Sequence, residues 1–450
     1  MDASLTFSPA PAVSPRRRLT RLAGQCPPVR LLELELSEPI PELAATLSRT
    51  GLPYPRALVL VRLHRKPLGL LPLDLRDGGL SARELAQVVW ARFRSQIARH
   101  LVADGEAQAE ELVVAGLPPR EPPPCGWENN AFRFEDLGLA SVVVTTCERP
   151  SQLLRALDSL LAQSYPTFEL IVVDNRPNAP LTRDAVARRY GADPRIRYIP
   201  ESRVGLSAAR NAGLAQARGE IVAFTDDDVT VDPHWLSSLA HAFLRYDAAC
   251  VTGLILPLEL ETRAQLWFEQ FGGFGKGFER RSFDLGSNRP PDALFPYAAG
   301  CFGSGANTAF RTSVLRELGG FAVELGAGTA AQGGEDLDAY LNVIHAGHRL
   351  VYEPRALLWH RHRRDLRGLS RQIHRYGIGL SAVLTKRFVA SAEERRQIVR
   401  RLPAGLAYAV DPRSAKNAGK GPGYPAWLTL LELAGMLRGP VAYAVARWSA

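Results

Sequence analysis

Three adjacent aspartates, Asp226, Asp227 and Asp228, follow an apolar run over residues 221–224. The run has the character of a buried strand, so the three carboxylates should stand at its carboxyl end. A packed strand gains nothing from adjacent acids, because like charges repel and each carboxylate costs free energy to desolvate. A divalent cation reverses this balance, since Mg²⁺ or Mn²⁺ takes one or two protein carboxylates and completes its shell with phosphate oxygens and water. The triplet therefore indicates a cation site, with a solvated acidic turn as the alternative.

A second acidic cluster, Glu335-Asp336, follows a glycine-rich stretch over residues 326–334. Glycines at such a place let the backbone approach a ligand closely or move as a lid. The pattern predicts a helix over residues 338–346, which makes Asp338 a helix cap. Glu335 and Asp336 would then lie just before this helix, as a second set of reactive carboxylates.

A third cluster, Trp359-His360-Arg361-His362, follows an apolar pair of leucines. A neutral imidazole can complete a metal shell, and histidine and arginine can both hold a diphosphate. A basic surface patch is the alternative. Of the two histidines, His360 is the better candidate for a metal ligand.

The elements that must position these clusters alternate between strand and helix from about residue 140. Near-continuous apolar strands separated by helices predict a parallel, doubly wound α/β sheet that is covered on both faces. Ligands bind such sheets beyond the carboxyl ends of the strands. Thr145, Asp174 and the aspartate triplet all fall at these ends, so we expect them to share one crevice. The predicted strands are 141–145, 170–173, 196–199 and 220–225, and the predicted helices are 151–163, 182–190 and 207–217.

The composition is that of a globular chain of 450 residues with a formal net charge of +9. Only five of its 55 Lys and Arg residues are lysines, which suits phosphate recognition by guanidinium groups but also fits a GC-rich genome. The five cysteines are scattered without a CxxC pair, as expected of reduced thiols in the cytoplasm. No apolar run reaches about 18 residues and no secretory signal is evident, so we expect a cytoplasmic protein with at most a peripheral, electrostatic contact with a membrane.

The chain divides into five predicted parts. A helix capped by Ser81 and a hairpin turning at residues 64–67 define a small α+β unit near the N-terminus. A proline-rich stretch then separates this unit from the α/β part. The parts are a disordered basic N-terminus (1–28), an α+β accessory module (29–117), a Pro-rich linker (118–139), the α/β domain (140–390) and a helical C-terminal extension (391–450).

Seven short motifs occur in order over residues 140–380. They are Val142–Pro150, Ser159–Pro166, Ile171–Asn175, Val204–Gly213, Phe224–Asp228, Gly303–Asn307 and Gly333–Asp338. No one of them is specific, but together and in this order they resemble the motifs of the family 2 glycosyltransferases, which have the GT-A fold.

The resemblance implies roles for individual residues. It equates Asp226 and Asp228 with the DxD motif, in which the last acid binds Mg²⁺ or Mn²⁺ and the first contacts ribose or metal. Asp227 should point away, because successive strand side chains alternate. His360 is the further metal candidate. The residues expected to bind the nucleotide sugar are Thr145, Glu148, Asp174 (through the nucleobase), Arg210, Asp226 and Asp227.

The implied reaction is inverting transfer of a sugar from a nucleotide diphosphate to an acceptor hydroxyl. This reaction needs one base on the acceptor, while a metal neutralises the departing phosphate. The resemblance assigns the base to Asp336, with Glu335 as the alternative. A nucleotidyltransferase and a non-catalytic nucleotide-sugar-binding module remain the other hypotheses.

The expected partners follow from this reaction. They are a nucleotide-sugar donor and a glycan, lipid-linked or small-molecule acceptor, as in cell-envelope or glycan biosynthesis, and no nucleic acid. A degenerate Q-x-x-R-W motif at Gln372–Tyr376 resembles that of processive synthases, but processivity is not expected without a membrane channel. The apolar and aromatic tail after Trp427 is compatible with either a packed terminal helix or a membrane contact.

Overall fold

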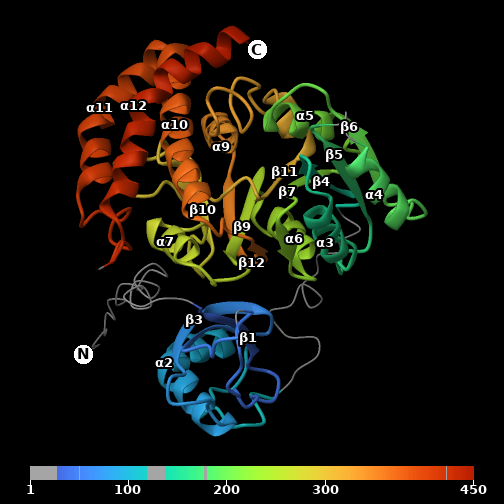
Figure 1. The fold of residues 1–450 in the computed structure, drawn as a ribbon, viewed down its shortest axis with the longest axis vertical. Helices are drawn as coiled ribbons and strands as arrows, with labels where there is room; N and C mark the ends of the chain where they lie inside the picture. Colours follow the sequence, from blue (N-terminus) through green and yellow to red (C-terminus); the bar gives the residue numbers. More distant parts are fainter. Residues whose placement is uncertain (1–27, 50, 119–136, 177–179, 422, 450) are drawn as a thin grey trace, which may run out of the picture.

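A computed structural model describes residues 28–49, 51–118, 137–176, 180–421 and 423–449. The predicted basic N-terminus lies almost entirely outside these residues, as does most of the predicted linker. Figure 1 shows a smaller N-terminal lobe below a larger α/β lobe, with three long helices along one side of the larger lobe.

The larger lobe is built on a nine-stranded sheet with the order β10-β12-β9-β11-β7-β4-β5-β6, and β8 pairs with β12. The parallel core predicted from the sequence is present, because β4 pairs in parallel with both β5 and β7, and β5 with β6. The strands are β4 (Ala140–Thr146), β5 (Phe168–Asp174), β6 (Ile196–Pro200), β7 (Ile221–Asp226), β8 (Val229–Val231), β9 (Cys250–Pro257), β10 (Arg281–Phe283), β11 (Asn307–Arg311) and β12 (Leu350–His360).

Helices cover both faces of this sheet, as near-continuous apolar strands require. Val142 and Val144 of β4 pack with the helices α3 and α6, whereas Val143 packs on the opposite face with α5 and α9. The helices of this lobe are α3 (Pro150–Leu161), α4 (Leu181–Tyr190), α5 (Leu206–Gln216), α6 (Trp235–Tyr246), α7 (Arg263–Phe271), α8 (Thr312–Glu317) and α9 (Glu335–His345). The prediction of a mostly parallel α/β sheet is therefore confirmed.

The sheet also contains antiparallel strands, whose positions the sequence analysis did not predict. β11 runs antiparallel between β7 and β9, and β8 and β10 run antiparallel to β12. These pairings join segments that are far apart in the chain, so no local pattern reveals them. They matter for function because β12 and β8 bring His360 to the end of β7.

The N-terminal lobe consists of β1 (Arg30–Glu35), β2 (Arg56–Leu63), β3 (Lys66–Asp74) and α2 (Ala82–Ala103). Ser81 caps α2 in a capping box with Glu84, as the sequence predicts for this helix start. The β2–β3 turn is tighter than expected, because the strands resume at Lys66 and leave only His64 and Arg65 between them. β1 was not predicted; it pairs in parallel with β2.

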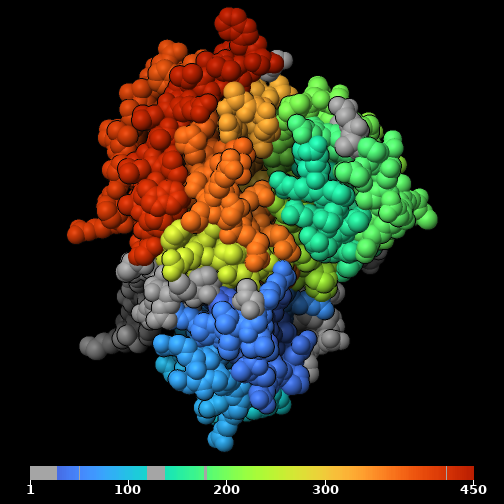
Figure 2. All heavy atoms as spheres, viewed as in Figure 1, coloured from blue at the N-terminus to red at the C-terminus, as the bar shows by residue number. Residues whose placement is uncertain are grey.

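The two lobes are in direct contact. Arg62 donates a 2.8 Å hydrogen bond to the buried Asp232, and Tyr54 donates a 2.6 Å bond to Glu261. Figure 2 shows the blue N-terminal lobe against the yellow-green part of the larger lobe.

Three long helices form the C-terminal part: α10 (Leu366–Ala390), α11 (Ala392–Val410) and α12 (Ala426–Ser449). A Cβ on Gly377 of α10 would lie 2.1 Å from the carbonyl oxygen of Glu432, and a Cβ on Gly435 of α12 would lie 2.2 Å from that of His374. These glycines therefore let α10 and α12 pack backbone against backbone.

α12 is long and apolar enough by composition to cross a membrane, and it is the one such helix among the described residues. The helix continues through Pro440, although a proline removes one backbone donor. A Cβ on the preceding Gly439 would lie 2.7 Å from the carbonyl oxygen of Ile378, so α10 packs closely against the helix at this point.

Candidate active site

The strand register brings the predicted residues to one edge of the sheet. Thr146 lies opposite Asp174, and Thr145 lies opposite Asp226. Asp174 is fully buried. Its carboxylate accepts hydrogen bonds from the Tyr198 hydroxyl (2.8 Å) and the Arg176 backbone N–H (3.0 Å). Its expected contact with a nucleobase stays a prediction.

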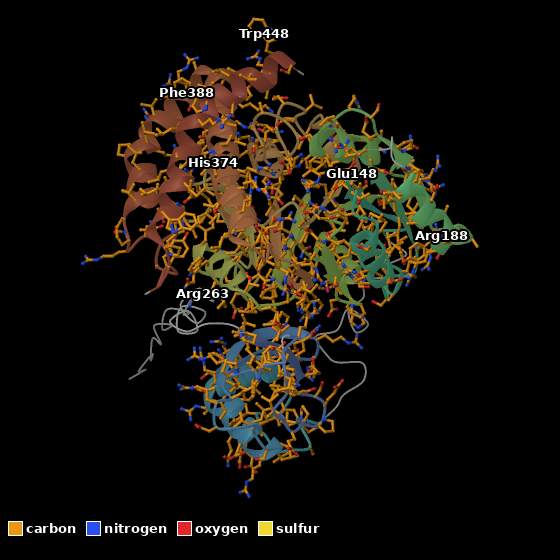
Figure 3. The ribbon with its side chains drawn as sticks, viewed as in Figure 1. Glu148, Arg188, Arg263, His374, Phe388 and Trp448 are labelled. Carbon is orange, nitrogen blue, oxygen red and sulfur yellow. The ribbon has the colours of Figure 1, made fainter. Side chains whose placement is uncertain are left out.

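Glu148, which is labelled in Figure 3, follows β4 in a left-handed conformation with φ of 55°. Its side chain is half exposed and forms a 3.1 Å ion pair with Arg176. It is therefore accessible to a ligand at the edge where β4 and β5 end.

Asp226, Asp228 and His360 form a cluster whose potential ligand atoms all lie within 4.8 Å of one another. The pairing of β12 with β8 sets His360 opposite Val229 and places its Nε2 3.2 Å from Asp228 Oδ1. Asp228 and His360 are buried, whereas the Asp226 side chain is 30% exposed. The structure thus brings together the three residues that the sequence named as metal candidates.

The electrostatics of this cluster favour an ionised Asp228 beside a protonated His360. Burial opposes ionisation of Asp228, but the charge and hydrogen bond of His360 and the charges of nearby arginines together hold the Asp228 pKa below its ordinary value. Burial also disfavours the charged form of His360, yet Asp228 raises the pKa of the histidine on balance. The pKa of Asp226 is raised, mainly by desolvation and against the pull of Arg210.

Asp227 makes contacts of its own. It accepts a 2.7 Å bond from the Thr146 hydroxyl and a 3.1 Å bond from Arg149, which also reaches Asp228 at 3.3 Å. Desolvation raises the pKa of Asp227 to about 6. With 4% exposure, it has little surface to offer a nucleotide, and the metal candidates lie on either side of it in the chain.

The second acidic cluster lies on the first turn of α9, not before a helix as we expected. Gly334 adopts a left-handed conformation with φ of 91° and starts the helix at Glu335. A Cβ at Gly334 would lie 2.7 Å from the carbonyl oxygen of Gly379, so the packing of α10 fixes this turn. The negative side chains of Glu335 and Asp336 are favourable at this positive end of the helix dipole.

Arg210 links the two acidic clusters. Its side chain is 2% exposed and lies 2.9 Å from Glu335 Oε1 and 3.4 Å from Asp226 Oδ1, and it donates to the carbonyl of Gly305. The guanidinium is buried between the carboxylates, and the contact with a nucleotide that the sequence suggested stays a prediction. Arg210 therefore holds the clusters at a fixed separation.

The two acids on α9 differ in burial and in hydrogen bonding. Glu335 is buried against Arg210, and desolvation, reinforced by Asp336, raises its pKa to about 7. Asp336 is partly exposed, and its Oδ2 accepts a 2.8 Å bond from the Gly305 backbone N–H. Asp336 is thus held by the Gly305 N–H and accessible to solvent, whereas Glu335 is buried in its ion pair with Arg210.

Three side chains near these clusters had no assigned role in our sequence analysis. Arg149 and Arg363 are each about 40% exposed and lie 3.3 and 3.8 Å from Asp228 Oδ2. Tyr376 of α10 stacks on Phe271, and its hydroxyl accepts a bond from Gln372. Arg149 and Tyr376 lie within motifs that the sequence showed, but their positions over the site depend on long-range packing.

We expect Gly305→Ala to lower turnover by about 10²-fold, because a misplacement of about 1 Å in a catalytic group can cost that much. An added Cβ would lie 2.7 Å from Arg210 Nη1 and 3.0 Å from Asp336 Cβ, so both clusters would have to shift. Gly300→Ala is the matched control, since its Cβ would meet no atom within 4 Å. Steady-state kinetics of the two variants test this, and equal kcat values would show that the clusters tolerate displacement.

Comparison with known proteins gives the following matches. Residues 141–319 match the family model described as glycosyl transferase family 2. The chain is 31% identical over 280 residues to a pre-mycofactocin glycosyltransferase of Mycobacterium tuberculosis, covering 60% of this chain and 53% of that one. It is 26% identical over 231 residues to a glucosyl-dolichyl phosphate glucuronosyltransferase of Haloferax volcanii, covering 49% and 68%. It is also similar to the structure of a mannosyltransferase from Pyrobaculum calidifontis in complex with GDP-Man and Mn²⁺, at 18% identity and a TM-score of 0.45 over 67% and 86% of the two chains.

The match to the M. tuberculosis relative thus spans about half of that protein's length. The family model covers β4, β5, β7 and β11, together with the aspartate triplet. The similarity to glycosyl transferase family 2 thus extends over residues 141–319.

Proposed function

We propose that this protein is an inverting glycosyltransferase that moves a sugar from a nucleotide diphosphate to an acceptor hydroxyl. One observation carries the proposal: a metal-type cluster, Asp226, Asp228 and His360, lies across Arg210 from a separate, accessible carboxylate, Asp336. A retaining or inverting hydrolase would instead need a carboxylic acid to protonate the leaving oxygen. A donor with a diphosphate leaving group needs cationic stabilisation instead, which an ion on the Asp226–Asp228–His360 cluster would provide.

The metal-type cluster fits a hard or borderline divalent cation. Two carboxylates and one imidazole are ligands that suit Mn²⁺, and Mg²⁺ is bound by carboxylates together with substrate phosphates. The partial exposure of Asp226 leaves room on one side for phosphate oxygens. Asp226, Asp228 and His360 would hold the ion, which would supply positive charge to the departing diphosphate.

The remaining chemistry falls to side chains of the chain itself. Arg149 and Arg363 are exposed guanidinium groups beside Asp228, placed to donate hydrogen bonds to the diphosphate. Asp336 accepts the proton of the acceptor hydroxyl as that oxygen attacks the anomeric carbon. The Gly305 N–H holds the Asp336 carboxylate in place for this transfer.

Turnover of a donor panel tests this function. Full-length protein is incubated with UDP-, GDP- and dTDP-sugars and Mn²⁺, with and without simple glycoside acceptors, and release of the nucleoside diphosphate is measured. We expect release from at least one donor class, and an anomeric configuration in the product opposite to that of the donor. A product that retains the donor configuration would contradict the assignment of Asp336 as a base.

We further propose that the protein works at the cytoplasmic face of an anionic membrane, on a lipid-linked acceptor. The support is an apolar stripe along the exposed face of α12. Its members are Trp427, Leu430, Ala434, Leu437, Val441, Val445 and Trp448, all exposed and spaced three or four residues apart. Trp448 stands clear of the rest of the molecule (Figure 3). The H. volcanii relative is named for a dolichyl phosphate acceptor, which agrees with a lipid-linked substrate.

The stripe has the properties of an interfacial helix. It has a tryptophan near each end, and Trp is favoured where the hydrocarbon of a membrane meets water. Its opposite side packs on α10, and the one acidic residue of α12, Glu432, is buried in an ion pair with Lys416. The exposed charges on α12 are the cations Arg438 and Arg447, which suit anionic lipid.

We expect Leu437→Glu together with Val441→Glu to reduce binding to anionic liposomes by at least about tenfold. Each change places a charge in the middle of the apolar stripe, where a buried carboxylate is unfavourable. Leu181→Glu is the control, because Leu181 is a similarly exposed leucine on α4. Flotation with phosphatidylglycerol vesicles at low and high salt provides the measurement. Equal flotation of the double variant and the control, or an α12 stripe that mediates a dimer instead, would overturn the membrane proposal.

A further inference from the structure

We propose that the N-terminal lobe holds a second metal site, formed by His64, His100 and Asp104, which binds Zn²⁺ or a similar divalent transition-metal ion. The three residues come from the β2–β3 turn and from the end of α2. Their side chains are 2%, 3% and 4% exposed, so this is a buried polar cluster and not a surface patch.

The three nearest atoms form an almost equilateral triangle. His64 Nδ1 lies 3.0 Å from Asp104 Oδ2, His100 Nε2 lies 3.1 Å from the same oxygen, and the two nitrogens are 3.1 Å apart. An ion about 1 Å above the plane of such a triangle is ~2.0–2.1 Å from each corner, which is the usual Zn–N and Zn–O bond length. Two histidines and one carboxylate with an open fourth position form a common transition-metal ligand set.

Hydrogen bonding alone cannot satisfy this triangle. Each ring nitrogen is either an N–H donor or a lone-pair acceptor, and an ionised carboxylate oxygen only accepts. If both histidines donate to Asp104, the two N–H groups face each other at 3.1 Å. If one histidine donates to the other, the accepting nitrogen faces the carboxylate with its lone pair. A cation inside the triangle removes this conflict, because all three atoms then act as electron-pair donors.

The position of Asp104 gives independent support. Asp104 is the C-cap of α2, where the helix dipole is negative and an acidic side chain is unfavourable. In the described part of the chain, its ion-pair partners are the two histidines and no Lys or Arg. A buried carboxylate at this end of a helix needs a positive charge, and a bound cation supplies it.

The backbone around His64 is fixed before any ion binds. His64 and Arg65 both have positive φ values, 52° and 66°, which non-glycine residues adopt only where the structure holds them. The Glu35 carboxylate holds this turn by accepting 2.9 Å bonds from both backbone N–H groups. The imidazole of His64 is thereby presented to the end of α2, and a bound ion would fasten the hairpin to that helix.

Zinc content and cobalt spectra of the full-length protein test the site. The wild type, His64→Asn and Asp104→Asn are loaded with Zn²⁺, dialysed against metal-free buffer and measured by plasma mass spectrometry. Asparagine is chosen at position 64 because it tolerates positive φ. We expect each variant to hold one zinc per chain fewer than the wild type, and a loss of zinc affinity of at least about 100-fold, since even outer-sphere changes cost 10- to 100-fold. This difference in zinc content does not depend on the Asp226–Asp228–His360 cluster, because that cluster is intact in all three proteins.

His345→Asn is the matched control, because His345 pairs with a single carboxylate, Glu394, and should leave zinc content unchanged. The Asp228→Asn protein, which lacks one ligand of the other cluster, is treated with chelator and then given Co²⁺. It should show the visible bands of a tetrahedral N,O site, and its thermal midpoint should rise with added Zn²⁺. This measurement keeps the proposal testable even if the His64 and Asp104 variants do not fold. Equal zinc content in the wild type and His64→Asn, or a chelated Asp228→Asn protein whose midpoint and cobalt spectrum do not respond, would overturn the proposal.

Discussion

Asp336→Asn should lower kcat by about 10²- to 10⁴-fold while leaving the affinity for the donor nearly unchanged. The amide keeps the shape of the side chain, and its oxygen can still accept the 2.8 Å bond from the Gly305 N–H. It cannot take the proton of the acceptor hydroxyl, so stabilisation is lost only in the transition state. Release of the nucleoside diphosphate gives kcat, and calorimetry with the donor gives affinity.

The neighbouring acids provide the comparison for this experiment. Asp338→Asn removes a carboxylate from the same turn of α9, but Asp338 is buried and paired with Lys386 and Arg387. We expect this change to lower thermal stability and to leave kcat within a few-fold of wild type. If Asp336→Asn is active and Glu335→Gln is inactive, the base is Glu335 and our assignment is reversed.

Asp228→Asn should weaken donor binding in Mn²⁺ by at least about 100-fold and reduce turnover correspondingly. The change removes one carboxylate of the proposed cation site and the charge that pairs with His360 at 3.2 Å, so the proposed ion and the imidazole would both lose a partner. Asp158→Asn is the control, because Asp158 is half exposed and paired with Arg189 on the surface. Calorimetric titration with nucleoside diphosphate measures the effect. Binding to Asp228→Asn that matches the control would show that Asp228 does not support the donor.

The parts of the fold that depend on local pattern could be predicted from the sequence. β4 and β5 are runs of apolar, largely β-branched residues, and the carboxylates that follow such runs must stand at the carboxyl edge of a parallel sheet. The grouping of Thr145, Asp174 and Asp226 at one edge therefore followed from the sequence alone. The choice of His360 over His362 is also consistent with the structure, where His362 bonds to Glu269 at 2.7 Å.

The parts that could not be predicted depend on contacts between distant segments. The start of α9 is set by Gly334, whose left-handed conformation depends on α10 packing against it. Arg210 bridges Asp226 and Glu335, which are 16 and 125 positions away from it. No periodicity in the sequence contains such information, because the bridge exists only once β7, α5 and α9 are assembled. The same holds for His64 and Asp104, which are 40 positions apart.

Calorimetry of the wild-type protein with UDP, GDP and dTDP, in Mn²⁺ and in EDTA, tests most directly whether the Asp226–Asp228–His360 cluster serves a nucleotide-sugar donor. We predict that at least one of the three nucleotides binds in Mn²⁺ and that EDTA weakens this binding by at least about tenfold, because the diphosphate and the cluster then share no ion. Affinity for every nucleotide that is the same with and without the metal would contradict the proposed site.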